Sequence, residues 1–167
     1  AVNKILLKAS QTTLPISQES GVVSSVTMTA RAVAFDGTTD QSVANAPIEF
    51  SMSGGPGGGE FLSPALAYTD SAGYAVATFT AGTASSIPNG VVIAARLQGS
   101  GIQTGTSPSN NSAQLTIGGQ ALSVAFGPAT KIESSSDNTL YTMAYSVQVT
   151  DANNNPVANQ PVTLRMR

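Results

Sequence analysis

The residues best suited to hold a metal ion lie together in one short polar segment, 151–155. Asp151, Asn153 and Asn155 carry side-chain oxygens at alternate positions, as the ligands of calcium-binding loops do. An EF-hand loop also needs a bidentate glutamate at its twelfth position, which is occupied by Val162. Asp and Asn also build turns by bonding to their own backbone. An Asx-rich turn is therefore the favoured interpretation, and a calcium site formed by these three residues is the alternative.

The composition gives little support for acid–base or nucleophilic catalysis. The 167 residues include no His and no Cys, which removes the commonest general base and any thiolate ligand. No two of the nine carboxylates are spaced along the chain in a way that indicates an acid–base pair. Asp36 and Asp40 lie in a polar loop, which is interpreted as a turn in the same way as the loop of Asp151. Ser is abundant, but no His is present to activate it. We therefore predict that the chain is not an enzyme and needs no cofactor.

A glycine-rich segment, 54–59, invites comparison with phosphate-binding loops. Such a loop needs a following Lys and Ser or Thr at the start of a helix. Here Glu60 and Phe61 follow, and no helical pattern begins there. The segment is therefore predicted to be a loop between strands.

Lys4 and Lys131 each flank apolar residues near the start of a predicted domain. A buried Lys beside an Asn and a carboxylic acid can form an intramolecular isopeptide bond in some surface proteins. The simpler interpretation, favoured here, is an edge lysine whose ammonium group reaches water.

The charge pattern excludes two classes of partner. The formal net charge is −2, and the few Lys and Arg residues are scattered. Nucleic acids require several cations to neutralise phosphates, so no nucleic-acid partner is expected. No apolar run approaches the ~18 residues that a spanning helix needs, so no membrane insertion is expected in this segment.

Alternation of apolar and polar residues predicts strands to position these side chains. Segments 26–32 and 143–150 alternate over their whole length, as strands with one buried face do. Glycine-, Asn- and Asp-rich turns separate such runs, and no segment has a helical period, which favours a β-sandwich. Three aromatic residues fit core positions: Phe50, Phe61 and Phe79. Four tyrosines are expected to be partly exposed: Tyr68, Tyr74, Tyr141 and Tyr145.

The segment 43–52 (VANAPIEFSM) recurs, with conservative changes, as 157–166 (VANQPVTLRM). The two copies lie 114 residues apart, counted from Val43 to Val157, which is about one domain. We therefore predict two domains, a complete one over 1–119 and the N-terminal part of a second one over 120–167. The incomplete second copy should expose apolar strand faces, because half a sandwich has nothing to pack on.

The segment 149–164 (VTDANNNPVANQPVTL) resembles bacterial immunoglobulin-like repeats of the intimin/invasin type. The segment 69–75 (TDSAGYA) is similar to a second signature of that family. The resemblance implies an immunoglobulin-like β-sandwich in tandem repeat. Copy one departs from the family pattern at 36–42, where DGTTDQS stands in place of an Asn-Gly-x-Pro turn.

The resemblance further implies an extracellular or bacterial cell-surface protein, in which such repeats are spacers that project a binding domain from the cell. The expected partners are then neighbouring repeats of the same chain. One alternative is a fibre subunit completed by strand exchange with another copy of the chain. Others are a glycan- or protein-binding module that uses the loops 54–59 and 99–112, and an accessory domain of a secreted hydrolase.

Overall fold

The computed structural model describes residues 1–18, 21–99, 111–119 and 121–165. The chain divides into two compact units, Ala1–Gly118 and Gly119–Arg167. Within the described residues, all regular secondary structure is β-strand, so the prediction of an all-β protein is confirmed.

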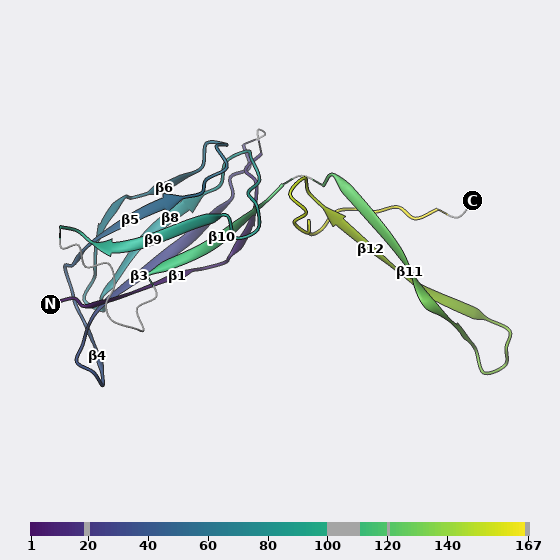
Figure 1. The fold of residues 1–167 in the computed structure, drawn as a ribbon, viewed down its shortest axis with the longest axis horizontal. Coiled ribbons are helices and arrows are strands. Elements are labelled where there is room, and N and C mark those ends of the chain that lie inside the picture. The colour runs from purple at the N-terminus through teal and green to yellow at the C-terminus, as the bar shows by residue number, and fades with distance from the viewer. Residues whose placement is uncertain (19–20, 100–110, 120, 166–167) are drawn as a thin grey trace. The chain divides into compact units, whose positions relative to one another are not determined.

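One sheet of the first unit has β1 (Lys4–Ala9) at its edge (Figure 1). The order continues through β3 (Ser25–Phe35) and β8 (Tyr74–Thr80) to β6 (Phe61–Ser63), and every pair is antiparallel. The short strand β4 (Asp40–Ser42) also pairs with β3, after Arg31, where the pairing of β3 with β8 stops. At that end of the sheet, β4 takes the place of β8 as the neighbour of β3.

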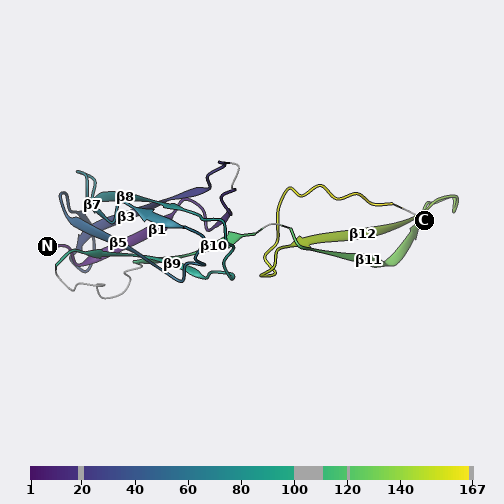
Figure 2. The same ribbon diagram turned by 90° about the horizontal axis from the view of Figure 1, so that it is seen from above.

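The second sheet of this unit follows the order β2 (Thr13–Pro15), β10 (Ser112–Gly118), β9 (Val91–Leu97), β5 (Pro47–Ser53) and β7 (Leu66–Tyr68). The pair β2–β10 is parallel, and the other pairs are antiparallel. Figure 2 shows the strands of this unit stacked as two layers.

Alternating side chains from both sheets form one hydrophobic core. Along β1, Ile5 and Leu7 are buried while Lys8 is exposed, as period-two burial requires. Strands β3 and β9 contribute further fully buried residues, among them Met28 and Ile93. The first unit is thus the β-sandwich that the sequence pattern predicts.

Two of the three aromatic core predictions are confirmed. Phe79 is fully buried and Phe50 is 5% exposed, whereas Phe61 is 54% exposed, so its prediction is wrong. Phe61 is the first residue of β6, a three-residue strand at the sheet edge, and Leu62 takes the inward position instead. The four tyrosines are exposed, as predicted.

The second unit consists of one long β-hairpin and an extended segment after it. Strands β11 (Ser123–Ser134) and β12 (Tyr141–Thr150) pair antiparallel, with an irregularity between Pro128 and Ile132. Residues 151–165 make turns and a single bridge, between Thr150 and Pro156, and no named strand. Figures 1 and 2 show β11 and β12 side by side along their length.

Candidate functional site

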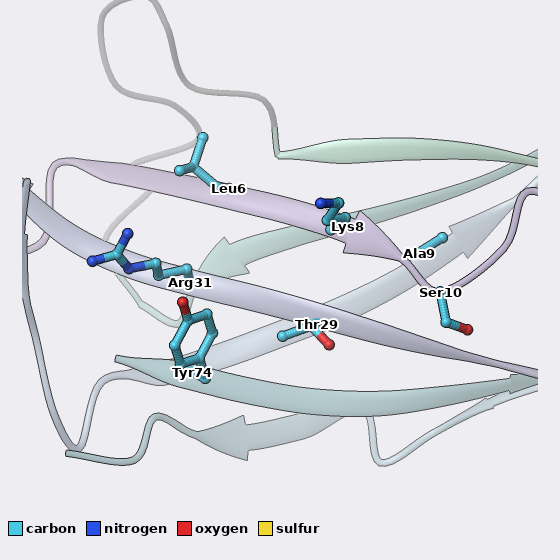
Figure 3. A pocket seen from close by; sticks show the side chains of 7 residues that line it. All are labelled: Leu6, Lys8, Ala9, Ser10, Thr29, Arg31 and Tyr74. Carbon is cyan, nitrogen blue, oxygen red and sulfur yellow. The ribbon is translucent and has the colours of Figure 1, made fainter. Parts of the chain in front are cut away.

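A shallow depression of about 460 Å³ lies on the outward face of β1, β3 and β8. Figure 3 shows its lining side chains, which are Leu6, Lys8, Ala9, Ser10, Thr29, Arg31 and Tyr74. Strand alternation explains this grouping for all but Ala9, because the neighbours of the other residues along each strand point into the core. Ala9 lies on the inward register and packs against the core.

The register of the sheet brings the charged and aromatic side chains of the depression together. Arg31 is opposite Leu6 on one side and Tyr74 on the other, and Lys8 is opposite Thr29. Residues opposite each other on the same face of a sheet are close enough to interact. The two cationic side chains therefore share one small patch with the Tyr74 ring.

The guanidinium of Arg31 has few partners in this patch. Its Cζ lies 5.7 Å from the centre of the Tyr74 ring, a cation–π contact. Its Nη2 donates a hydrogen bond to Ser42 Oγ at 3.3 Å. Its Nε is buried and has no hydrogen-bond partner among the described residues. A buried donor without an acceptor is costly, which makes Arg31 a candidate binding residue.

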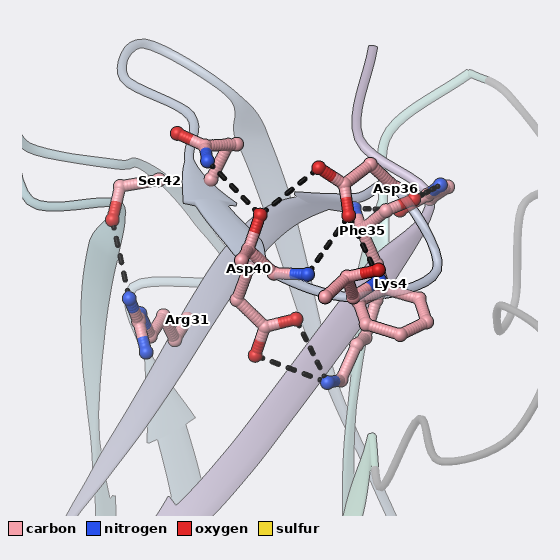
Figure 4. Close-up of polar contacts among 10 residues, drawn as sticks. Lys4, Arg31, Phe35, Asp36, Asp40 and Ser42 are labelled. Carbon is pink, nitrogen blue, oxygen red and sulfur yellow. Dashed lines mark hydrogen bonds and ion pairs between the residues drawn. The ribbon is translucent and has the colours of Figure 1, made fainter.

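Lys4 projects from the same face of β1 but is neutralised. Its Nζ lies 3.0 Å and 3.1 Å from the two carboxylate oxygens of Asp40 and 4.9 Å from the centre of the Phe35 ring (Figure 4). Lys4 is only 8% exposed, so the expectation of an edge lysine reaching water is wrong for this residue. The reason is β4, which pairs with β3 and carries Asp40 to the ammonium group. Lys131, by contrast, is exposed beside Glu133.

The three candidate calcium ligands form a compact turn. Asp151 Oδ1 accepts hydrogen bonds from the amides of Asn153 and Asn155 at 2.8 Å and 2.9 Å. Asp151 Oδ2 accepts from the Gly119 amide and from the Asn155 side-chain amide, at 2.6 Å and 2.9 Å. The carboxylate is thus directed at four N–H donors of the chain itself, in the manner of an Asx turn.

The environment of Asp151 shifts its acidity. Burial alone would raise the pKa of this carboxyl, but hydrogen bonds from Asn155, Gly119 and Asn153 outweigh it and leave the pKa below its usual value. The ionised form is therefore the one that the turn stabilises.

Asp36 and Asp40 have separate roles. Asp36 Oδ1 accepts from the amides of Thr38 and Thr39, both at 2.8 Å, and these bonds lower the pKa of Asp36. Asp40 instead holds Lys4. The loop around Asp36 therefore has a different hydrogen-bond pattern from that around Asp151, although the sequence interpretation treated the two as equivalent.

The glycine-rich segment 54–59 packs closely against residues 82–83. The Glu60 carboxylate accepts hydrogen bonds from the amides of Gly57 and Gly58, both at 2.8 Å. Burial would raise the pKa of Glu60, yet these bonds hold it below its usual value. The Gly58 carbonyl accepts from the Thr83 amide at 2.9 Å. A Cβ on Gly82 would lie 2.1 Å from the Gly58 carbonyl oxygen, so only glycine allows this approach. Most of the loop 99–112 lies outside the described residues.

No group of three or more His, Cys, Asp or Glu side chains is arranged to hold a metal ion within the described part of the chain. No helix there is long and apolar enough to cross a membrane.

Comparisons with models of known protein families, with curated proteins and with solved structures found no match.

The depression around Lys8, Arg31 and Tyr74 was missed by the sequence analysis. Strand alternation alone could have placed Arg31 and Thr29 on one face, but the register that sets Lys8 beside them is not visible in the sequence.

Proposed function

We propose that the chain is a structural spacer segment of a bacterial extracellular or surface-anchored protein, built from immunoglobulin-like repeats that project a binding domain from the cell. On this proposal the second unit is the beginning of another sandwich. Further strands, equivalent to β7, β8, β9 and β10 of the first unit, cover it in the assembled array. The partner of each repeat is then its neighbour along the same polypeptide.

The recurrent segments 43–52 and 157–166 support the repeat interpretation through their backbone as well as their residues. Asn45 and Asn159, at matching positions, both adopt positive φ angles, 54° and 59°. Each follows an Ala in a turn and is separated by one residue from a Pro. Asn tolerates this left-handed conformation better than most residues do. The same turn at the same place in both copies is expected of a repeated domain.

The observation that carries the proposal is the contrast in burial at matching positions. Ile48 is fully buried and Phe50 is 5% exposed, whereas Val162 is 42% and Leu164 is 62% exposed. In the first unit, β5 is paired with β9 and β7, and its inward side chains lie in the core between the two sheets. The described residues of the second unit provide no such strands. The apolar pattern therefore needs strands of the same kind to cover it.

The hairpin of the second unit also exposes apolar residues. They are Leu122, Val124, Phe126, Ile132, Leu140, Tyr141 and Tyr145. A two-stranded sheet is marginally stable in water, and exposed apolar surface of this extent marks an interaction face. In a repeat array each domain buries its own core and touches only its neighbours, so rigid domains in series act as a spacer.

A chimeric extension tests the domain assignment. Residues 54–118 of the first unit are joined directly after Arg167, where the 114-residue offset places them. Hydrogen exchange should then become slow at β12, and a second cooperative unfolding transition should appear. Fast exchange at β12 in the extended chain would overturn the assignment. The matched control joins the same 65 residues in scrambled order.

Labelling of intact cells tests the location. Antibodies against residues 1–118 should label unpermeabilised cells of the organism that makes the protein. Labelling only after permeabilisation would contradict the surface proposal. A cytosolic marker stained in parallel shows whether the cells are intact.

The strand-exchange alternative makes a different prediction for the 167-residue chain. If another copy supplied the missing strands, light scattering would show dimers or polymers with slow exchange at β12. Under the spacer proposal, β12 stays unprotected in the unextended chain, whatever weak association its apolar surface causes.

A further inference from the structure

We propose that the depression of Lys8, Arg31 and Tyr74 is a binding site for an acidic saccharide, a sugar unit that carries a carboxylate. This inference does not depend on the spacer proposal, because it concerns one face of the first unit alone. It rests on unpaired positive charge, on an arginine with free donor capacity, and on a lining of mixed hydroxyl and apolar character.

Three cations, Lys4, Lys8 and Arg31, lie on the outward face of β1 and β3. Lys4 has its counterion in Asp40. Neither Lys8 nor Arg31 takes part in the ion pairs found among the described residues. Two positive charges that share a small depression without a carboxylate repel each other, and an anionic ligand between them relieves that repulsion.

Arg31 supplies the specific recognition of a carboxylate. A guanidinium has five N–H donors in a plane and binds carboxylates through two parallel hydrogen bonds. Only the bond from Nη2 to Ser42 is made by this group in the described part of the chain. The Tyr74 ring lies against the guanidinium and restricts its orientation. The group is therefore preorganised, and because Nε is buried, the donors that remain for a ligand are those of the two Nη atoms.

The rest of the lining selects among anions. Ser10, Thr29 and Tyr74 contribute hydroxyl groups, which exchange hydrogen bonds with sugar hydroxyls. Leu6 contributes an apolar surface that suits the C–H face of a sugar ring. The depression has a volume of about 460 Å³, which is within the usual range for small-ligand sites. A carboxylate, several hydroxyls and an apolar ring face occur together in an acidic sugar.

The primary test is an NMR titration of the chain with three probes, namely glucuronate, glucose and acetate. We expect saturable shifts of the amides of Lys8, Thr29 and Arg31 with glucuronate, at least tenfold weaker binding of acetate, and no saturation with glucose. Because the site is shallow, affinity in the millimolar range is expected. Equal binding of acetate and glucuronate would mean a general anion site and would overturn the saccharide assignment. No saturable shift with glucuronate would overturn the site itself.

Variants locate the binding. Lys8→Gln should weaken glucuronate binding about tenfold, the usual cost of one charge-assisted hydrogen bond. Arg31→Lys keeps the charge but removes the planar donor pair, and should also weaken binding about tenfold. Lys131→Gln, a change at an exposed lysine of the second unit, is the matched control and should leave binding unchanged.

The variant outcomes are separable from folding defects. Lys8 is exposed, so Lys8→Gln should keep the unfolding midpoint of the parent chain. Unchanged affinity in folded Lys8→Gln would overturn the proposal, as would equal losses in Lys8→Gln and Lys131→Gln. None of these results bears on the chimeric extension or on cell labelling, which test the spacer proposal separately.

Discussion

Asp70 and Asp151 build the same turn in the two units. Asp70 Oδ1 accepts from the amides two and four residues later, at 2.9 Å each, and Asp151 Oδ1 does so at 2.8 Å and 2.9 Å. In both turns the third residue after the aspartate, Gly73 or Asn154, has a positive φ angle. Its backbone N–H donates a hydrogen bond to the backbone carbonyl of the aspartate. The Asx turn is therefore a recurrent device of this chain for ending one strand segment and starting another.

The pH dependence of the Asp151 turn follows from the direction of its pKa shift. The folded pKa is below the unfolded value, so folding favours the ionised form. The resulting stabilisation is complete above the unfolded pKa of about 3.9 and is lost as pH falls through the lower folded pKa. We expect the Asn153 and Asn155 amide resonances to titrate together below about pH 4. Titration of these amides at or above the ordinary aspartate value would contradict this.

Removal of the carboxylate should open the same turn at neutral pH. Asp151→Ala leaves the amides of Gly119, Asn153 and Asn155 without their acceptor. We expect the local opening free energy, measured by amide exchange, to fall by about 1–3 kcal/mol. Asp137→Ala is the control, because Asp137 belongs to the exposed hairpin turn and should not change exchange at Asn155.

Loss of Asp40 and loss of Lys4 should lower the unfolding free energy by different amounts. Asp40→Ala leaves the buried ammonium of Lys4 without a counterion, and we expect a loss of about 2 kcal/mol in unfolding free energy. Lys4→Met removes the charge and keeps an apolar stem, so it should cost less. Chemical denaturation of both variants and of the double variant measures the difference. An Asp40→Ala loss no larger than that of Lys4→Met would contradict the argument.

The sequence predicts the architecture well because burial in a sandwich follows period-two alternation. Segment 26–32 alternates in sequence and in the structure, where it forms the central part of β3. The pattern fails for Phe61, because strand ends at a sheet edge leave one side open to water and hydrophobicity alone does not reveal an edge. The alternation pattern also fails to predict the burial of Lys4. That burial depends on the three-residue strand β4, and so short a polar segment cannot be recognised as a strand from its sequence.

The candidate site depends on information that a single sequence lacks. Residues Lys8 and Arg31 are 23 positions apart, and only the β1–β3 register brings them to one patch. A shift of one residue in that register would turn Lys8 to the opposite face of the sheet, away from Arg31. The Asp151 turn, in contrast, is local, so turn chemistry at 151–155 was enough to favour it from the residues alone.

The contact between two glycine segments of the first unit should be intolerant of side chains. Gly82→Ala would place a Cβ 2.1 Å from the Gly58 carbonyl oxygen and 2.8 Å from the Glu60 amide nitrogen, both backbone atoms that cannot rotate away. Overpacking of this kind costs about 1–3 kcal/mol, and we expect a loss of that size in the unfolding free energy. Gly118→Ala is the control, since its nearest neighbour would be 3.9 Å away. Equal stability of the two variants would contradict the close-packing argument.

The unequal burial of the two units should appear in limited proteolysis. The side chain of Lys131 is 79% exposed on a hairpin that has no covering layer among the described residues. The first unit has a continuous core and requires larger openings before its strands reach a protease. Trypsin should therefore cut the second unit first, at Lys131 and at Arg165, and leave residues 1–118 resistant, as mass spectrometry of a time course would show. Lys131→Gln should remove the cut within the hairpin and leave the cut at Arg165, while cleavage first at Arg31 or Arg96 would show that the sandwich is the less stable unit.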